Sequence, residues 1–494
     1  MIGLVPLQDA GGSIDERIQE TLGPIADRVT SIVFYGVTVG GVEVRLIVVW
    51  LIAAALFFTL YFGFLNVRGF THALDLVRGR YSNPQDAGEV SHFQALATAV
   101  SGTVGLGNIA GVAVAIAIGG PGATFWMAFA GFLGMSSKMA ECTLGVKFRK
   151  ENPDGSVSGG PMYYLSRGLA EQGKPGLGRT LAIMFAIFCI GGALGGGNMF
   201  QANQATQQIV NVTGGADSPL DDLRWLVGLV FAIAVGAVII GGIKSIARVT
   251  EKLVPAMAVV YVTACLAVIV GNATLVPSAF VEIFAGAFAA DAAVGGVLGV
   301  LIVGFQRAAF SNEAGIGSAA IAHSAVRTKQ PATEGHVALL EPFIDTIVIC
   351  TMTALTIVIS GAWDDPDAPD LGGVSLTSRA FESVLPWFPT VLAVAVVLFA
   401  FSTMISWSYY GMKATRYLAG DSPAAENVFK LVFCVFVVIG ASLALGPVIG
   451  ISDSMIFLMA IPNVLGLYLL ARVVKQEIMQ YRAKVGSGEI VRTK

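Results

Sequence analysis

The stretch VSGTVGLGNIAGVAVAIAIGG, residues 100–120, is apolar enough to cross a bilayer, but its first half contains four glycines and an asparagine. Glycine permits an irregular backbone and lets a ligand approach without a Cβ in the way. A helix that breaks inside a bilayer exposes N–H and C=O groups, and each is costly unless a partner satisfies it. A polar ligand can be that partner. An outer half-helix beginning near Gly107 offers N–H groups to a carboxylate, and an inner half ending near Gly102 offers carbonyls to a cation.

The glycines also have a plainer interpretation, in which they only let neighbouring helices pack closely. Asn108 needs a separate explanation under that interpretation, and so does a second motif of the same kind. VGLGNIA from Val104 resembles AGIGSAA from Ala314, and the corresponding glycines of the two motifs are 210 positions apart. We therefore favour two ligand-binding breaks, one near Gly107 and one near Gly315.

The composition is that of an integral membrane protein. Of 494 residues, 55% are hydrophobic and only 13% are charged, whereas soluble domains have about 25% charged residues. A net charge of -3 without a run of Lys or Arg argues against nucleic acid as a partner. The five cysteines lie singly in apolar runs and are expected to be buried small side chains rather than disulfides or metal ligands.

Hydropathy predicts eleven membrane-spanning segments, each near the length of about 20 residues that a crossing needs. They are 44–65, 93–118, 124–147, 180–208, 223–243, 252–271, 296–323, 336–360, 388–412, 429–446 and 454–474. Ahead of the first segment, apolar residues recur at helical spacing at Ile14, Ile18, Leu22, Ile25 and Val29. Residues 1–43 are therefore expected to form an amphipathic segment on the membrane surface.

The loops between these segments sort by charge. Basic residues gather in alternate loops, for example Arg78, Arg149 and Lys244, and in the tail from Arg472. The other loops are acidic, with Asp221 and the run WDDPDAPD among them. By the positive-inside rule the basic loops are cytoplasmic. We therefore expect a multi-pass protein of the plasma (inner) membrane, with its N-terminus outside and its C-terminus in the cytoplasm.

The offset of 210 positions also superposes predicted segments two to six on segments seven to eleven. The chain then divides into an extra helix at 44–65, two five-helix units at 92–271 and 296–474, and a tail at 475–494. Because five is odd, the second unit enters the membrane from the opposite face. The predicted fold is all-α, with an inverted 5+5 repeat and two broken helices, and such repeats are typical of secondary transporters.

Three longer motifs carry a family resemblance: GGPGATFWMAFAGFLGMSSKMAECTLGVKFR, GGPMYYL and FSNEAGIGSA. They resemble the signatures of the alanine or glycine:cation symporters, the sodium:alanine symporters, over nearly all of the chain after Val44. VGLGN from Val104 is also similar to the first core helix of the neurotransmitter:sodium symporters. One position departs from the family pattern, because Ala128 stands where the family usually has tryptophan, and we expect it to face lipid or a neighbouring helix.

The resemblance implies a leucine-transporter type of fold and sodium-driven uptake of alanine or glycine, with no organic cofactor and no enzymatic activity. Proton-coupled uptake of a related zwitterion is the alternative. A channel is a weaker alternative, because a channel needs a continuous polar pore. A membrane enzyme needs clustered acid, base or metal-binding residues. The four histidines, His72, His92, His323 and His336, are scattered along the sequence.

Residue roles follow from the resemblance by position. The substrate carboxylate is expected against Gly105 and Gly107, and its ammonium against Ser311, Asn312 and the carbonyls before Gly315. A first sodium ion would bind the Thr103 carbonyl and the Asn108 side-chain oxygen. A second sodium ion would bind the carbonyls of Ser101 and Val104 and the hydroxyls of Ser402, Thr403 and Ser406. Hard cations prefer such oxygen ligands.

Two further sets of residues keep open alternatives. Asn198 and Gln201 share one helix face and either bind substrate or join helices, and Trp407 either covers the side-chain pocket or is a packed aromatic. The full substrate set is Thr103, Gly105, Gly107, Asn108, Asn198, Gln201, Ser311, Asn312, Gly315 and Trp407. The cation set is Ser101, Thr103, Val104, Asn108, Ser402, Thr403 and Ser406.

Charged residues inside membrane segments are functional candidates. Lys138 and Glu141 have the spacing of an ion pair on one helix face, and we expect them to pair. The roles of four others stay open: Arg307 at an outer gate, Glu313 as a link between half-helices or a proton acceptor, and Glu341 and Asp345 at an inner gate or as helix anchors. The run from Asp364 to Asp370 is expected to be a solvated outer loop.

Overall fold

The computed structural model describes residues 24, 27–39, 41–83, 85–153, 155–289, 295–364, 372–384, 386–420 and 422–492. Most of the predicted surface segment 1–43 and most of the acidic run after Asp364 fall outside these ranges. The described residues are mostly helical, as predicted. Their strands form two short antiparallel pairs, β1 Gly36–Val39 with β2 Val42–Arg45 and β3 Lys150–Glu151 with β4 Val157–Ser158.

In the described part of the chain, six helical segments are long and apolar enough to cross a membrane. Four are single helices: α12 Gly242–Gly271, α20 Phe388–Leu418, α21 Pro423–Ser442 and α22 Leu445–Gly486. The other two are composite: α9 Pro175–Leu194 with η2 Gly195–Met199 and α10 Phe200–Val212, and α16 Pro331–Ala338 with α17 Leu340–Pro342, η5 Phe343–Cys350 and α18 Thr351–Ser360. These lengths support the prediction of a multi-pass membrane protein.

The remaining helices are shorter, less apolar or broken. A bent pair, α5 His92–Thr103 with η1 Gly107–Gly111 and α6 Val112–Gly119, makes a seventh span if it is counted as one. Shorter apolar helices are α2 Leu46–Tyr61, α11 Arg224–Ile239, η4 Ala273–Leu275 with α13 Val276–Ala287, and α14 Gly296–Asn312. The others are α3 Leu65–Arg68, α4 Phe70–Val77, α7 Gly122–Lys147, α8 Pro161–Glu171, η3 Gly215–Asp217, α15 Ala319–His323, η6 Ala362–Asp364 and α19 Val374–Glu382. Each predicted segment overlaps at least one helix, but eleven crossings and the inverted repeat stay predictions.

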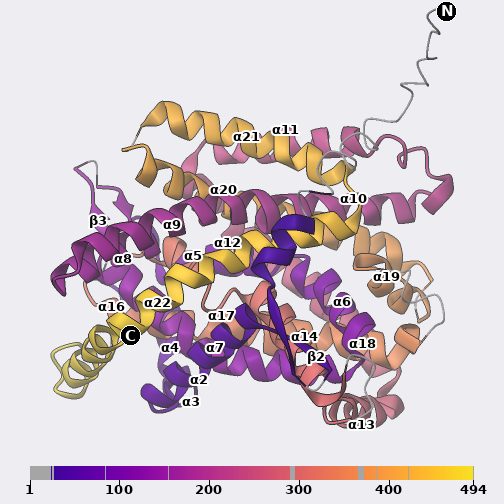
Figure 1. The fold of residues 1–494 in the computed structure, drawn as a ribbon, viewed down its shortest axis with the longest axis horizontal. Helices are drawn as coiled ribbons and strands as arrows, with labels where there is room; N and C mark the ends of the chain where they lie inside the picture. Colours follow the sequence, from indigo (N-terminus) through magenta and orange to yellow (C-terminus); the bar gives the residue numbers. More distant parts are fainter. Residues whose placement is uncertain are drawn as a thin grey trace, which may run out of the picture.

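Figure 1 shows α11 and α21 side by side along one edge of the molecule, packed against α10 and α20. The outer faces of these two edge helices are apolar and exposed, with Val230 and Ile233 on α11 and Val428 and Leu431 on α21. Apolar faces of this kind suit contact with lipid. The interior lies below them, where α20 packs against α5, α9 and α12.

The first predicted break is present in the structure. A capping box begins α5, because the Ser91 hydroxyl accepts from the Gln94 N–H and the Gln94 side chain accepts from the Ser91 N–H. The helix ends at Thr103, and the chain turns by 52° before it continues in η1 and α6. A Cβ at position 105 would lie 3.0 Å from the Gln201 Oε1 and would also clash with the Thr403 hydroxyl. Glycine at 105 therefore permits this close approach of two other helices.

The second predicted break is present between α14 and α15. Glu313 ends α14 with a φ of 56°, a left-handed conformation that is uncommon outside glycine. Gly315 and Gly317 follow with φ values of 89° and 94°, where a side chain would be strained. The Asn312 Oδ1 accepts a hydrogen bond from the Ala314 N–H at 2.9 Å, which supports the turn. Both helices therefore break at positions where glycines cluster in the sequence.

Candidate substrate and cation site

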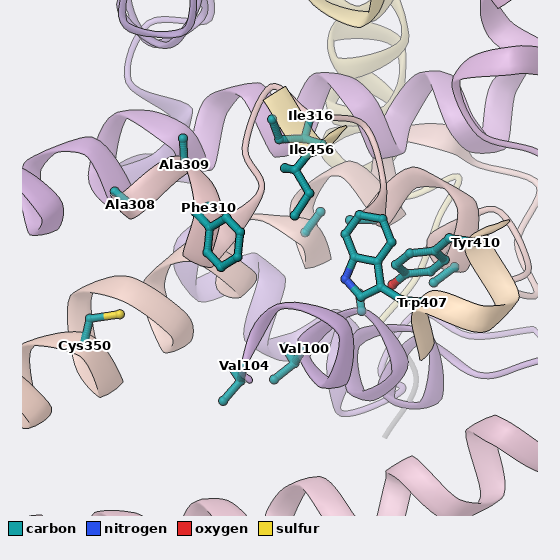
Figure 2. Packing of buried hydrophobic residues seen from close by; sticks show 14 of the residues in the cluster. Val100, Val104, Ala308, Ala309, Phe310, Ile316, Cys350, Trp407, Tyr410 and Ile456 are labelled. Atoms are coloured by element: carbon teal, nitrogen blue, oxygen red, sulfur yellow. The ribbon is translucent and has the colours of Figure 1, made fainter. Parts of the chain in front are cut away.

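The two breaks meet in the interior around one small cavity. It is nearly closed in this structure, with about 10 Å³ open to a water-sized sphere, and is lined by Gly102, Thr103, Gly107, Gly196, Gln201, Phe310, Glu313, Trp407 and Ile456. Figure 2 shows Phe310, Ile456 and Trp407 around the same space, near Val100 and Val104 of the first broken helix. Such a space holds about one water molecule, so binding of even a small amino acid requires the surrounding side chains to move apart.

One end of the cavity can bind an anion. The Gly105 N–H is already occupied, by the Thr103 carbonyl at 2.9 Å and the Asn108 Oδ1 at 3.0 Å. The Leu106 N–H donates to the Gln201 Oε1 at 3.0 Å. The Gly107 N–H has no acceptor within hydrogen-bond distance among the described residues. Of the two glycines that were predicted to bind a carboxylate, Gly107 is therefore the one with a donor left for it, at the start of a helix.

Another wall of the cavity carries a buried carboxyl group. Glu313 is 2% exposed, accepts a hydrogen bond from the Trp407 Nε1 at 3.1 Å, and accepts a second from the Ser318 hydroxyl. The same Trp407 nitrogen donates to the Gly102 carbonyl at 3.2 Å, so this indole links the two broken helices. In the described part of the chain no Lys, Arg or His forms an ion pair with Glu313. A buried carboxylate in this position can receive an ammonium group.

The rest of the wall is apolar and close-packed. Phe310, Trp407 and Ile456 are all at least nine-tenths buried. A Cβ at Gly196 would lie 3.4 Å from the Phe310 ring and would clash with the Ile456 side chain. The apolar wall therefore limits the size of any side chain that binds against it.

The hydroxyl residues of the predicted second cation site converge between α5 and α20. The Ser101 hydroxyl donates to the Ser402 carbonyl at 2.8 Å, and the Thr403 hydroxyl donates to the Ser101 carbonyl at 3.0 Å. The Ser406 hydroxyl lies 3.0 Å from the Ser101 hydroxyl. All of these groups are buried oxygens, which a hard cation such as sodium prefers. The residues present therefore fit a sodium ion, and Val104 lies one turn further along the same helix end.

Asn108 of the predicted first cation site and Ser311, which was predicted to receive the substrate ammonium, both contact Asp345, and neither Ser311 nor Asn312 is among the residues that line the cavity. Asn108 donates from its Nδ2 to the Asp345 Oδ1 at 2.7 Å, and the Ser311 hydroxyl donates to the Asp345 Oδ2 at 2.8 Å. The Asn312 Nδ2 donates to the Thr346 hydroxyl at 2.9 Å. The carbonyl of Thr103 faces the Gly105 N–H. The chain therefore adds a carboxylate to this oxygen-rich set.

Other predicted site residues point elsewhere. Asn198 donates to the Phe433 carbonyl on α21 at 2.7 Å and does not line the cavity, which matches the helix-joining alternative. Gln201 lines the cavity, but its Oε1 accepts a hydrogen bond from the Leu106 N–H and its Nε2 donates one to the Gly196 carbonyl. A Cβ at Gly315 would face Leu51 and Val464 rather than the cavity.

The predicted ion pair between Lys138 and Glu141 is wrong. The Lys138 ammonium donates to the Glu341 carboxylate at 2.8 Å, and Glu141 accepts instead from the Asn463 Nδ2 at 2.9 Å. The spacing places both residues on one face of α7, but α17 brings a second carboxylate to the same lysine. Because Glu341 lies about two hundred residues later in the sequence, no local pattern could have indicated it.

A charged cluster lies beside the cavity, with the Arg307 guanidinium 5.5 Å from the centre of the Phe310 ring. Arg307 pairs with Asp453 on α22, and Gln306 donates to the same carboxylate at 3.2 Å. The Arg45 guanidinium donates to the Gln306 Oε1 at 2.5 Å. An open cavity of about 410 Å³ lies against these residues. This cluster thus separates the small cavity from a wide vestibule on the side predicted to be outside.

A second barrier lies at the other ends of the two broken helices. The Arg149 guanidinium donates to four carbonyls, those of Ala87, Ser324, Val326 and Thr328, at 2.6 to 3.1 Å. These carbonyls belong to the segment before α5 and the segment after α15. Burial lowers the pKa of the Arg149 guanidinium from its ordinary value. Arg149 therefore holds the two broken helices together on the side predicted to be cytoplasmic.

Glu334 joins the same two helices deeper inside. Its carboxylate is bonded to the His92 Nδ1 at 2.5 Å and to the His323 Nδ1 at 2.6 Å, and all three residues are buried. The sequence scatters these histidines, and only the fold brings them to one carboxylate. Within the described ranges, no three His, Cys, Asp or Glu side chains are arranged to hold a metal ion. The cysteines there are free, and four of the five are fully buried.

Comparisons with known proteins agree with this picture. A model of the "Sodium:alanine symporter family" matches residues 31–494. The "Sodium/alanine symporter AgcS" of Methanococcus maripaludis is 41% identical over 430 residues, covering 87% of this chain and 92% of that protein. The "Probable sodium/glutamine symporter GlnT" of Bacillus subtilis is 32% identical over 448 residues, covering 90% and 89%.

A solved structure shares the fold. MhsT in complex with L-phenylalanine aligns with a TM-score of 0.53 at 14% sequence identity, covering 80% of this chain and 99% of that one. This likeness supports the leucine-transporter type of fold that the sequence motifs imply. The family match extends over nearly the whole chain, and the related proteins are transporters rather than enzymes. The chain therefore belongs to the sodium:alanine symporter family of membrane transporters.

Proposed function

We propose that this protein is a sodium-coupled symporter that takes up a small neutral amino acid, alanine or glycine, by alternating access. The observation that carries the proposal is the cavity between the two broken helices, which combines the Gly107 N–H, the Glu313 carboxylate and a tight apolar wall. A zwitterion with a short side chain is the ligand that matches all three. Family membership and the printed name of AgcS support the same substrate class.

The substrate would bind through three contacts. Its carboxylate accepts from the Gly107 N–H, where the helix dipole favours negative charge. Its ammonium pairs with Glu313, and its side chain lies against Phe310 and Ile456. Because a buried polar group that loses its partner is penalised, ligands that lack either charge are rejected. A leucine side chain would meet the apolar wall, so leucine is excluded by size.

Sodium would bind at the two oxygen-rich sets beside this cavity. One set is formed by Ser101 with Ser402, Thr403 and Ser406, each of which has an oxygen within hydrogen-bond distance of a Ser101 oxygen. The other includes Thr103 and Asn108, which belong to the same break as Gly107. A cation at either set brings α5 closer to its neighbours and supplies positive charge near the substrate carboxylate. Ion and substrate then increase each other's affinity, as thermodynamic linkage requires.

Alternating access requires one barrier on each side of the cavity. We assign the outer barrier to Arg307 with Asp453 and the inner barrier to Arg149 with the backbone that it holds. Opening of one barrier while the other stays closed would expose the cavity to one side at a time. The charge pattern of the loops supports an outer N-terminus and a cytoplasmic C-terminus in the plasma membrane.

Uptake into proteoliposomes tests the proposal. With the purified protein and an inward sodium gradient, labelled alanine is expected to accumulate above its external concentration. Glycine is expected to compete and leucine is not. A proton gradient imposed without sodium should give no accumulation, and accumulation under that condition would instead establish proton coupling. Simple equilibration would indicate a channel. Strong competition by glutamine would contradict the small substrate.

A further inference from the structure

We propose that Asp345 is a permanent anionic ligand of the first sodium site, so that sodium binds there before the amino acid arrives. This inference rests on the proposed sodium coupling and adds a residue and an order of binding to it. Asp345 lies in η5, on the helix that follows the second break. It is 0% exposed, in contact with both broken helices.

Among the residues that the structure describes, Asp345 has polar partners but no positively charged one. Its Oδ1 accepts from the Asn108 Nδ2 at 2.7 Å, and its Oδ2 accepts from the Ser311 hydroxyl at 2.8 Å and the Thr346 hydroxyl at 2.7 Å. All three donors are neutral. Among the described residues no Lys, Arg or His forms an ion pair with Asp345, and the buried Lys138 pairs with Glu341 instead. Burying a charge without a counter-charge is strongly unfavourable, so the site calls for a cation.

The groups around Asp345 are those that an alkali cation binds. Each hydroxyl of Ser311 and Thr346 donates to Asp345 and still has lone pairs for a cation. The Asn108 Oδ1 accepts the Gly105 N–H and has a second lone pair. One carboxylate with hydroxyl and amide oxygens is a hard-ligand set of low total charge. This set suits a monovalent cation better than a divalent one, which usually takes more carboxylates.

The backbone around the site gives an independent indication. Three π-helical stretches, η1, η2 and η5, occur in the described residues. Such stretches are rare in proteins, and those that do occur often lie at functional sites. η1 carries Gly107 and Asn108, η2 carries Gly196 of the cavity wall, and η5 carries Asp345. η1 and η5 pack against each other. The irregular turn at Asp345 thus faces the irregular turn that contains the proposed substrate contacts.

A carboxylate supplied by the protein has a consequence for the order of binding. If the negative charge came from the substrate, the first cation would bind well only with substrate present. With Asp345 in place, sodium neutralises a charge that already exists in the empty protein. Bound sodium would then fix Asn108, and through it the Gly105 N–H and the break that presents Gly107. Sodium therefore prepares the substrate site.

The test measures sodium binding without any amino acid. The thermal stability of the purified full-length protein is followed while choline chloride is replaced by sodium chloride at constant ionic strength. A ligand that binds only the folded state raises stability with its concentration. The wild-type protein is expected to show a saturable sodium effect, and Asp345→Asn should weaken its apparent sodium affinity about 10- to 150-fold, the range for one lost charge-assisted contact. Glu141→Gln removes another buried carboxylate and should leave the sodium affinity unchanged.

Further variants keep the test decisive. If Asp345→Asn does not fold, Asp345→Glu, which keeps the charge, and Ser311→Ala, which removes one oxygen, should fold and show intermediate losses of sodium affinity. The same sodium affinity in Asp345→Asn and wild type at pH 6 and pH 8 would overturn the inference, and would indicate that a proton neutralises Asp345. Sodium-driven alanine uptake by the wild-type protein would still stand in that case. Failure of that uptake would instead remove the proposed function itself.

Discussion

Replacement of Glu313 by glutamine removes the carboxyl group that is proposed to pair with the substrate ammonium and changes the shape of the cavity very little. The Trp407 Nε1 lies 3.1 Å from the Glu313 Oε1 and can donate equally well to an amide oxygen. The Ser318 hydroxyl can rotate to accept from the new NH₂ group. The left-handed backbone at position 313 is no less accessible to glutamine than to glutamate. The variant therefore isolates the charge that is expected to pair with the substrate ammonium.

The size of the effect follows from the kind of contact that is lost. Hydrogen bonds to charged groups contribute about 1.5 to 3 kcal/mol, which corresponds to about a 10- to 150-fold change in affinity. The ammonium is expected to lose its charged partner and to keep a neutral one. We therefore expect the apparent affinity for alanine to fall by at least about tenfold.

The assay compares alanine with lactate, in which a hydroxyl replaces the ammonium and the carboxylate is kept. Both are used as competitors of sodium-driven glycine uptake in proteoliposomes, normalised to folded protein. Wild type should prefer alanine strongly. In Glu313→Gln the alanine affinity falls while the lactate affinity stays close to its wild-type value, so the preference shrinks. Glu141→Gln serves as the matched control, because Glu141 is also a buried carboxylate but contacts Asn463 instead of the cavity.

Two results would refute the assignment. A folded Glu313→Gln protein with wild-type alanine affinity would show that Glu313 does not bind the ammonium. An equal loss for alanine and lactate would show that Glu313 only supports the turn between α14 and α15.

Three further predictions follow from the same geometry. Ile456→Ala removes most of a side chain that lines the cavity and so enlarges the cavity, and valine should then begin to compete with alanine for uptake. Continued exclusion of valine would show that Ile456 does not set the size limit. Thr403→Ala removes one neutral oxygen contact, worth about 0.5 to 1.5 kcal/mol, so the half-saturation concentration of sodium for uptake should rise about 2- to 13-fold, and an unchanged value would remove Thr403 from the second cation site. A cysteine at Asp222 should react with a membrane-impermeant reagent from outside and one at Lys174 only after permeabilisation; the reverse pattern would invert both barrier assignments.

Local sequence was sufficient to predict the two breaks, because their cause is local. Glycines at 105 and 315 and a polar residue within an apolar stretch are visible without the fold. The family motifs then implied the fold type and most residues of the two cation sets. The structure brings Ser101 together with Thr403, about three hundred residues later in the sequence, as the family resemblance implied.

The remaining features depend on partners that only the fold supplies. Asn108 was expected to offer its oxygen to sodium, whereas the structure also uses this side chain to hold the Gly105 N–H and Asp345. Glu313 was ambiguous because its left-handed backbone and its contact with Trp407 cannot be read from the sequence. Lys138 was assigned to the wrong carboxylate for the same reason, since its true partner belongs to another helix.

The most direct test of the account is equilibrium binding of radiolabelled alanine to the purified protein while sodium is replaced by choline. The account predicts that binding rises with sodium and is lost in Gly196→Ala, whose added methyl group would occupy the cavity against Ile456 and Phe310. Alanine binding that is independent of sodium, or that persists at wild-type affinity in folded Gly196→Ala, would contradict the claim that this cavity is the sodium-coupled substrate site.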